Sequence, residues 1–294
     1  MKKTILTLSV LFALTNFAEA NTTRILHVDS PEFMDQPFEV LTSGSREVIE
    51  VNANNLELIE KLKDASINND EVIFQYTDNE VSDLTVVAKQ EGQVSSEELH
   101  PMLNYTPTDV ESYDVAAEMF QTLNTSTKMF SQCFNRAHIW AKQLSDNFKV
   151  DSMKILIYYT KKYRREINKK WWFHIAPMVQ VGDERYVLDR EFTRKPYTDE
   201  NWEKIFTKKM EEKGIYGYRC KVIKNIKEFY DQNNQDNEYC NIQVTSMYYW
   251  EPNDMSRLDK TGVQKTTFID RELKMAAKEA FKKWKKVYQS LTVQ

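Results

Sequence analysis

The stretch of sequence that decides the fold is Trp171-Trp-Phe-His-Ile-Ala-Pro-Met-Val-Gln-Val181, followed by Gly182-Asp183 and then by Arg185-Tyr-Val-Leu-Asp189. Aromatic and β-branched residues dominate both runs, and such residues favour strands. The pair Gly182-Asp183 is typical of a tight hairpin turn. The sequence therefore predicts two antiparallel strands that are joined by this turn.

The register of this hairpin brings two polar residues together. A turn centred on Gly182-Asp183 places Val181 opposite Glu184, and the same register places His174 opposite Glu191. Asp189 is then a diagonal neighbour of His174 on the same face of the sheet. A carboxylate beside an imidazole can fix its tautomer and stabilise its positive form.

A helix is predicted from Gln132 to Leu144, and it carries a cysteine in its first turn. One apolar stripe runs along it, made of Cys133, Ala137, Trp140 and Leu144. Ser131 stands where an N-cap belongs. The free N–H groups and the positive dipole end of a helix start stabilise a thiolate, and they can also hold an oxyanion.

A reactive thiolate needs an imidazole partner, and the sequence offers four histidines. His27 and His100 lie in a separate acidic segment or in the linker that follows it. His138 is turned by about 140° around the helix from Cys133, so we assign it a structural role. His174 remains as the partner of Cys133.

The order Cys133, His174, Asp189 along the chain fits a papain- or transglutaminase-like core of the α+β class. The alternative is that Cys133 is an inert cysteine of the hydrophobic core, which is common for this residue type. The sequence has no Cys/His cluster with zinc-ligand spacing, so we expect no metal and no cofactor.

Three blocks together resemble the bacterial protein-glutaminase family. They are Cys133-Phe-Asn-Arg-Ala-His138, Trp172-Phe-His-Ile-Ala-Pro177 and Tyr186-Val-Leu-Asp-Arg-Glu-Phe192, and the resemblance covers about Gln132 to Phe206. It implies that Cys133 is the nucleophile, His174 the general acid and base, and Asp189 the orienting carboxylate. It also implies a secreted precursor with a pro-region before the catalytic domain.

The implied reaction is the deamidation of glutamine side chains in proteins or peptides, through a cysteine thioester, to glutamate and ammonia. A transglutaminase or a cysteine peptidase with the same core, or a catalytically silent interaction protein, are the alternatives. Trp172 is a weaker candidate for a wall of the substrate slot, because aromatic side chains line pockets but fill cores more often.

The N-terminus has the pattern of an exported protein. Lys2 and Lys3 precede a short apolar run, and Ala18-Glu-Ala20 suits a signal peptidase, so we expect residues 1–20 to be a signal peptide. The apolar run is too short to span a membrane comfortably, and no run of 18 apolar residues follows. The expected location is secreted or periplasmic.

Charge divides the 294 residues into two parts, and a chain of this length commonly forms two domains. Residues 21–110 hold 18 acidic and 5 basic side chains, a net charge of −13, whereas residues 111–294 have a net charge of +8. We expect 21–110 to be an acidic α+β pro-region that ends in a polar linker after Lys89, and 111–294 to be the catalytic domain with a C-terminal helix over Asp270–Gln289.

This asymmetry suggests that the two parts of the chain attract each other, and a solvated acidic surface is the alternative. The resemblance to a secreted precursor implies in addition that the pro-region covers Cys133 and inhibits its own catalytic domain until the linker is cut. The basic run from Lys161 to Lys170 is expected to be a solvated loop that could receive it, and no nucleic-acid partner is expected at a net charge of −4. An exported protein favours disulfides, and Cys220 and Cys240 are the expected pair, which leaves Cys133 free.

Overall fold

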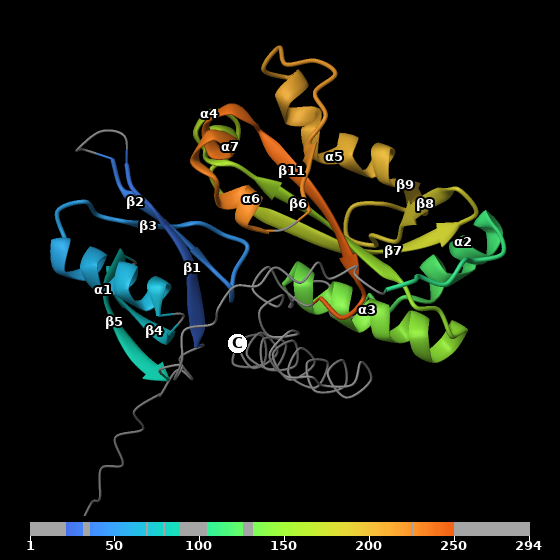
Figure 1. The fold of residues 1–294 in the computed structure, drawn as a ribbon, viewed down its shortest axis with the longest axis horizontal. Helices are drawn as coiled ribbons and strands as arrows, with labels where there is room; N and C mark the ends of the chain where they lie inside the picture. Colours follow the sequence, from blue (N-terminus) through green and yellow to red (C-terminus); the bar gives the residue numbers. More distant parts are fainter. Residues whose placement is uncertain are drawn as a thin grey trace, which may run out of the picture.

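The six-stranded sheet that holds the predicted hairpin is the larger of two sheets in the computed structural model, which describes residues 22–31, 36–68, 70–78, 80–88, 105–125, 132–224 and 226–249 (Figure 1). Its strand order is β10-β11-β6-β7-β8-β9, and all pairs are antiparallel except β10 with β11. The strands are β6 (Met153–Tyr159), β7 (Phe173–Val181), β8 (Glu184–Val187), β9 (Tyr197–Thr198), β10 (Lys221–Val222) and β11 (Cys240–Ser246).

Helices cover both faces of this sheet. They are α2 (Tyr113–Thr122), α3 (Cys133–Phe148), α4 (Lys161–Glu166), α5 (Asp199–Glu211), α6 (Ile226–Tyr230) and α7 (Gln232–Asn237). Every residue of β6 is buried, because Ile155 and Ile157 pack with α5 while Leu156 and Tyr158 pack in the cluster that includes α3. Figure 1 shows α3 and α5 on opposite sides of the sheet.

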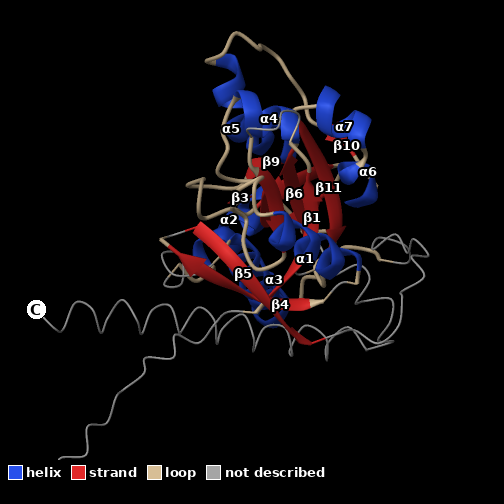
Figure 2. Cartoon of the chain, turned by 90° about the vertical axis from the view of Figure 1, so that its left-hand side faces the viewer, coloured by secondary structure: helices blue, strands red, loops and turns tan. Residues whose placement is uncertain are grey.

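The smaller sheet belongs to the acidic N-terminal segment and has the order β3-β2-β1-β4-β5. Its elements are β1 (Thr23–Asp29), β2 (Phe38–Thr42), β3 (Ile49–Val51), α1 (Leu56–Ile67), β4 (Glu71–Thr77) and β5 (Glu80–Ala88). The N-cap Asn55 accepts a hydrogen bond from the Leu58 backbone, and α1 turns its apolar side to a core of its own (Figure 2). We call the elements from β1 to β5 the N-terminal module.

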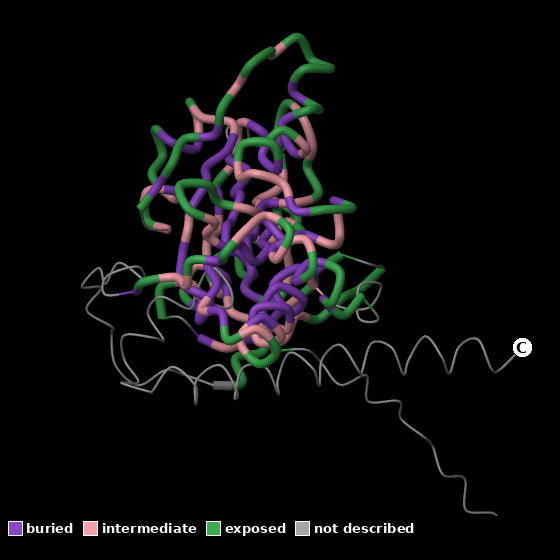
Figure 3. Tube along the Cα trace, turned by 90° about the vertical axis from the view of Figure 1, so that its right-hand side faces the viewer, coloured by how far each residue is buried: buried purple, intermediate pink, exposed green. Residues whose placement is uncertain are grey.

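The α+β class is confirmed, and so is the register of the hairpin. Val181 pairs with Glu184 and Met178 with Val187. Strand pairing ends at Val187, so Asp189 lies in the turn that follows β8 rather than on a strand. The buried residues gather in the interior of the molecule, and the exposed ones lie along its outer loops (Figure 3).

Two local expectations need correction. The helix predicted from Gln132 begins at Cys133 and continues to Phe148, past the expected end at Leu144, and its N-cap Gln132 makes no side-chain capping bond. The basic run at 161–170 is not a solvated loop, because it starts with α4, in which Tyr163 and Arg164 are buried. Apolar packing under α4 and ion pairs with the N-terminal module explain this difference.

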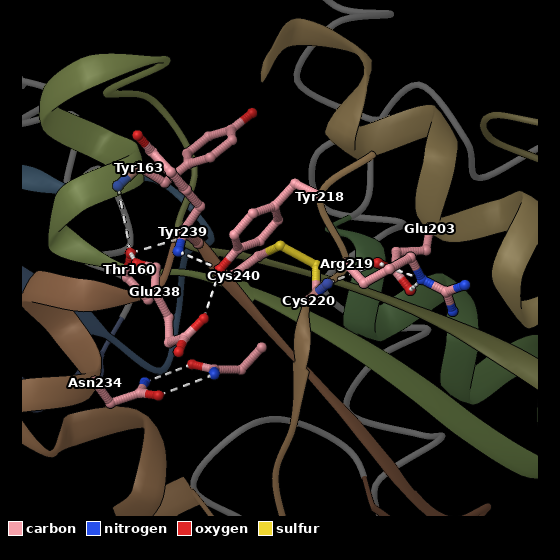
Figure 4. The surroundings of a disulfide bond; sticks show 11 residues. Thr160, Tyr163, Glu203, Tyr218, Arg219, Cys220, Asn234, Glu238, Tyr239 and Cys240 are labelled. Carbon is pink, nitrogen blue, oxygen red and sulfur yellow. Dashed lines mark hydrogen bonds and ion pairs between the residues drawn. A yellow bond between two sulfur atoms is a disulfide. The ribbon is translucent and has the colours of Figure 1, made fainter. Parts of the chain in front are cut away.

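The expected disulfide is present. Cys220 and Cys240 are bonded, with their Cα atoms 4.8 Å apart (Figure 4). Cys133 is a free, buried thiol. The bond ties the residue before β10 to the first residue of β11. Glu203 of α5 accepts a hydrogen bond from the Cys220 backbone at 2.7 Å, so the bridge also anchors α5.

Several expected segments lie outside the described residues. These are the signal peptide at 1–20, most of the linker after Lys89, Ser131, and the helix at 270–289. Residues 105–110 are described and run along the six-stranded sheet, where the backbone N–H of Val110 donates to Gln180 and the Tyr105 hydroxyl donates to Ser152. No described helix is long and apolar enough to cross a membrane.

Candidate active site

The free thiol lies at the first residue of α3. Cys133 is 1% exposed, and its helix has no acidic residue in its first turn. The backbone N–H groups of a first helical turn have no partner within the helix. The thiol therefore lies where backbone N–H groups and the helix dipole both favour a negative charge.

The predicted histidine and aspartate are in contact. His174 is on β7, and its Nε2 lies 2.9 Å from Oδ2 of Asp189, with both side chains almost completely buried. Asp189 is itself held by two further donors. The indole N–H of Trp202 in α5 donates to Oδ2 at 2.9 Å, and the backbone N–H of Glu191 donates to Oδ1 at 3.0 Å.

The imidazole of His174 also forms a side-chain hydrogen bond with Cys133. Because Asp189 occupies Nε2, Nδ1 is the nitrogen that is left to face the thiol. The structure thus brings together all three residues that the sequence proposed, from a helix start, a strand and a turn. The edge of the imidazole also packs against aromatic rings of Phe192 and Phe206, which fix its orientation.

Electrostatics favour a thiolate beside an imidazolium. Burial alone would raise the pKa of Cys133, but the hydrogen bond and charge of His174, with Arg46 and Arg136, hold that pKa below its ordinary value. Burial would lower the pKa of His174, yet Asp189 and then Cys133 raise it to about 9. Burial would raise the pKa of Asp189, but the charge and hydrogen bond of His174, together with the hydrogen bonds from Trp202 and the Glu191 backbone, hold that pKa below its ordinary value.

A loop of the N-terminal module enters this site. The backbone of Arg46 accepts a hydrogen bond from Trp172 at 2.9 Å, and the Val48 N–H donates to Lys170 at 3.2 Å. The guanidinium of Arg46 lies 3.7 Å from the ring centroid of Trp171, and its Nη1 lies 3.4 Å from Nδ1 of His174. We call residues 43–48 the inserted loop.

Ion pairs hold the rest of the N-terminal module near this site. Arg164 of α4 is completely buried between Asp29, at 3.5 Å, and Glu39, at 3.1 Å, and Lys161 lies 3.7 Å from Asp29. Beside them, His27 stacks on Tyr230. The acidic segment is therefore docked on the basic run, as the opposite charges suggested.

Trp172 is completely buried, in an aromatic cluster with Tyr158, Phe173 and Phe229. Its indole N–H donates to the carbonyl of Ser45 in the inserted loop at 3.1 Å. A role for Trp172 in the wall of a substrate slot stays a prediction, because the inserted loop covers this edge of the ring.

Sequence reasoning missed three residues that touch the triad. Trp202 gave no signal, because it is an aromatic residue on an ordinary amphipathic helix. Arg46 is a single basic residue in an acidic segment. Glu191 was paired with His174 by the register, but its ion pairs to Arg46 and Arg136 depend on tertiary structure.

No group of three or more His, Cys, Asp or Glu residues in the described part of the chain is arranged to hold a metal ion. The residues at this site bring a thiol, an imidazole and a carboxylate together at the start of α3, where backbone N–H groups have no partner within the helix. This combination suits attack on a carbonyl carbon, followed by protonation of the leaving group.

Comparison with known proteins relates this site to a family. A family model that is described as glutaminase matches residues 114–206, a range that includes Cys133, His174 and Asp189. A search among curated proteins found no match.

A search among solved structures found one that shares the fold of this chain. A mutant of pro-protein-glutaminase matches with a TM-score of 0.50 and 15% identity, covering 79% of this chain and 84% of that one. Pro-protein-glutaminase itself matches with a TM-score of 0.48 and 14% identity, covering 79% of this chain and 83% of that one. The NMR structure of protein-glutaminase from Chryseobacterium proteolyticum matches with a TM-score of 0.27 and 18% identity, covering 34% of this chain and 65% of that one.

Proposed function

The family-model match and the shared fold support assigning the chain to the protein-glutaminase family, and on this premise we propose that it is the zymogen of a hydrolase that deamidates glutamine side chains in proteins or peptides. Cys133 is the nucleophile, His174 the general acid and base, and Asp189 the orienting carboxylate. The observation that carries the proposal is the contact of His174 with both Cys133 and Asp189.

The reaction has two halves. The Cys133 thiolate attacks the carboxamide carbon of glutamine, and backbone N–H groups at the start of α3 stabilise the oxyanion. His174 gives its proton to the carboxamide nitrogen, and the C–N bond breaks. Ammonia departs, and a thioester remains on Cys133. Water then gives a proton to His174 as it attacks the thioester carbon. The C–S bond breaks, which releases glutamate and restores the thiolate–imidazolium pair.

We further propose that the N-terminal module is the inhibitory pro-region, within the limits 21–110 inferred from charge, after a signal peptide at 1–20 that directs export to the periplasm or the medium. The inserted loop supports this, because Arg46 occupies the space in front of His174. Arg46 therefore blocks the approach of a substrate carboxamide to Nδ1, the nitrogen that must give its proton to the departing ammonia.

A cut in the linker, between Lys89 and Tyr105, would free the pro-region without damage to the catalytic sheet. The chain after Tyr105 is already paired with that sheet, which supports a cut before it. The test is limited proteolysis of purified protein, followed by incubation with casein. Ammonia, new glutamates, isopeptide crosslinks and backbone cuts are then measured on the same samples.

Each product identifies one enzyme class. Ammonia with new glutamates is the expected result, crosslinks identify a transglutaminase, and backbone cuts identify a peptidase. The matched control is Cys133→Ser, cut in the same way. If the cut protein forms no product and its Cys133 reacts with iodoacetamide no faster than an ordinary thiol, a silent interaction protein is the better interpretation.

A further inference from the structure

The side chain of Glu191 places a carboxylate next to the imidazole of His174. The backbone N–H of Glu191 donates to Asp189, and this hydrogen bond fixes Glu191 next to His174. Its Oε2 forms an ion pair with Arg136, one turn after Cys133 on α3, and lies 4.0 Å from Nδ1 of His174. Arg136 is only 2% exposed, so it anchors Glu191 from the interior of the protein.

The second oxygen of Glu191 faces the inserted loop. Oε1 lies 3.4 Å from Nη2 of Arg46, while Nη1 of the same guanidinium lies 3.4 Å from Nδ1 of His174. Arg46 thus contacts the carboxylate with one nitrogen atom and the imidazole with the other. When the inserted loop leaves, Oε1 and Nδ1 face the same vacated space.

In the proposed reaction, the departing nitrogen must occupy this space. It has to approach Nδ1 to receive the proton, because Nε2 is engaged by Asp189. The carboxamide nitrogen of glutamine carries two hydrogens. A carboxylate can only accept hydrogen bonds, so Glu191 suits an –NH2 group and disfavours the carboxylate of the product.

We propose that Glu191 is the specificity-determining residue of this site, which accepts a hydrogen bond from the –NH2 group of a primary carboxamide and repels a carboxylate in the same place. The proposal rests on the proposed function, in which glutamine is the substrate and glutamate the product. Like charges in a partly desolvated site repel strongly, so the product is expelled. The ion pair with Arg136 holds Glu191 in position.

The test compares two reagents of nearly equal size. Iodoacetamide carries a primary carboxamide, and iodoacetate carries a carboxylate in its place. We would measure the alkylation rate of Cys133 by each reagent in linker-cut protein, assayed as the unfractionated digest. The ratio of the two rates reports amide preference, and it does not require deamidation.

Glu191→Gln keeps the shape and removes the charge, so the ratio of iodoacetamide to iodoacetate rates should fall about tenfold. Glu191→Asp keeps the charge and should keep most of the preference. Glu212→Gln, at an exposed position after α5, is the matched control and should not change the ratio. An unchanged ratio in a folded Glu191→Gln protein overturns the proposal.

A second measurement covers the case in which Glu191→Gln does not fold. In the unsubstituted cut protein, a glutamine peptide should protect Cys133 from iodoacetamide at about tenfold lower concentration than the same peptide with glutamate. Equal protection overturns the proposal. Ammonia release with an unchanged ratio refutes only the role of Glu191, whereas a changed ratio without ammonia release refutes only the proposed function.

Discussion

Replacing Asp189 with Asn should uncouple His174 from Cys133 while leaving the shape of the site intact. Asp189 is the largest influence that raises the pKa of the buried His174, to about 9. The amide has no charge, so burial then dominates and the pKa of His174 should fall to 6.5 or lower. A fall in the pKa of about 2.5 corresponds to roughly 3 kcal/mol of lost imidazolium stabilisation.

The sign of this change determines the pH profile. The thiolate–imidazolium pair exists from the lowered pKa of Cys133 up to about pH 9, where His174 loses its proton. In Asp189→Asn the proton returns to sulfur at neutral pH. The acid limb of Cys133 alkylation should therefore move upward towards the ordinary thiol pKa of about 8.5, and the rate at pH 6 should fall by at least about tenfold.

The assay is the rate of iodoacetamide alkylation between pH 4 and 10 in linker-cut protein, with ammonia release measured in parallel. Loss of the orienting carboxylate should reduce the turnover number by about 10³- to 10⁴-fold. Asp183→Asn, in the exposed hairpin turn, is the control and should leave both profiles unchanged. An alkylation profile of Asp189→Asn that coincides with that of the unsubstituted protein would refute the coupling.

The same pair affects stability. A histidine whose pKa is raised on folding stabilises the protein fully below its unfolded pKa, and this contribution is lost as pH rises through the folded value. The contribution of His174 should therefore be lost between about pH 6.5 and 9. Chemical unfolding at pH 6 and pH 9.5 would show a smaller difference in Asp189→Asn than in the unsubstituted protein.

Three further outcomes are expected. Cys133→Ser should abolish ammonia release and change the free energy of unfolding by less than about 1 kcal/mol; residual deamidation would exclude Cys133 as nucleophile. Asp29→Asn removes one of the two carboxylates that pair with the buried Arg164. Calorimetry of cut protein should therefore show the N-terminal module dissociating at least about tenfold more readily. An unchanged affinity of the module for the rest of the protein would show that the Asp29–Arg164 ion pair does not hold them together. Replacing Cys220 and Cys240 by Ser opens a 20-residue loop and should cost about 3 kcal/mol, seen as a thermal midpoint lowered by roughly 5–10 °C.

The hairpin and its register were predictable because they depend on neighbouring residues. A turn pair and two strand-forming runs determine which residues oppose each other, so the closeness of His174 and Asp189 followed from local rules. The end of strand pairing at Val187 was not predictable. Just after that end, Asp189 accepts hydrogen bonds from the Trp202 indole and from the Glu191 backbone. Trp202 is on α5, and the packing of α5 against the sheet is a matter of tertiary structure.

The N-terminal module shows the same division. The sequence predicted its α+β class, and its charge indicated attraction to the basic part of the chain. No local signal marked Arg46 as the residue that enters the site. Its position depends on backbone pairing of the inserted loop with residues that lie more than 120 positions later.

The amino-acid sequence alone indicated the proposed type of chemistry, because a cysteine at a helix start, a histidine on a strand and an aspartate across a turn are local features with few arrangements. It also predicted the disulfide pair, because Cys220 and Cys240 are close in sequence and the chain has only three cysteines. Only the tertiary structure decided which groups surround the triad. Trp202, Glu191, Arg136 and Arg46 reach it from separate elements, and burial strengthens each of their charges and hydrogen bonds only when those elements pack together.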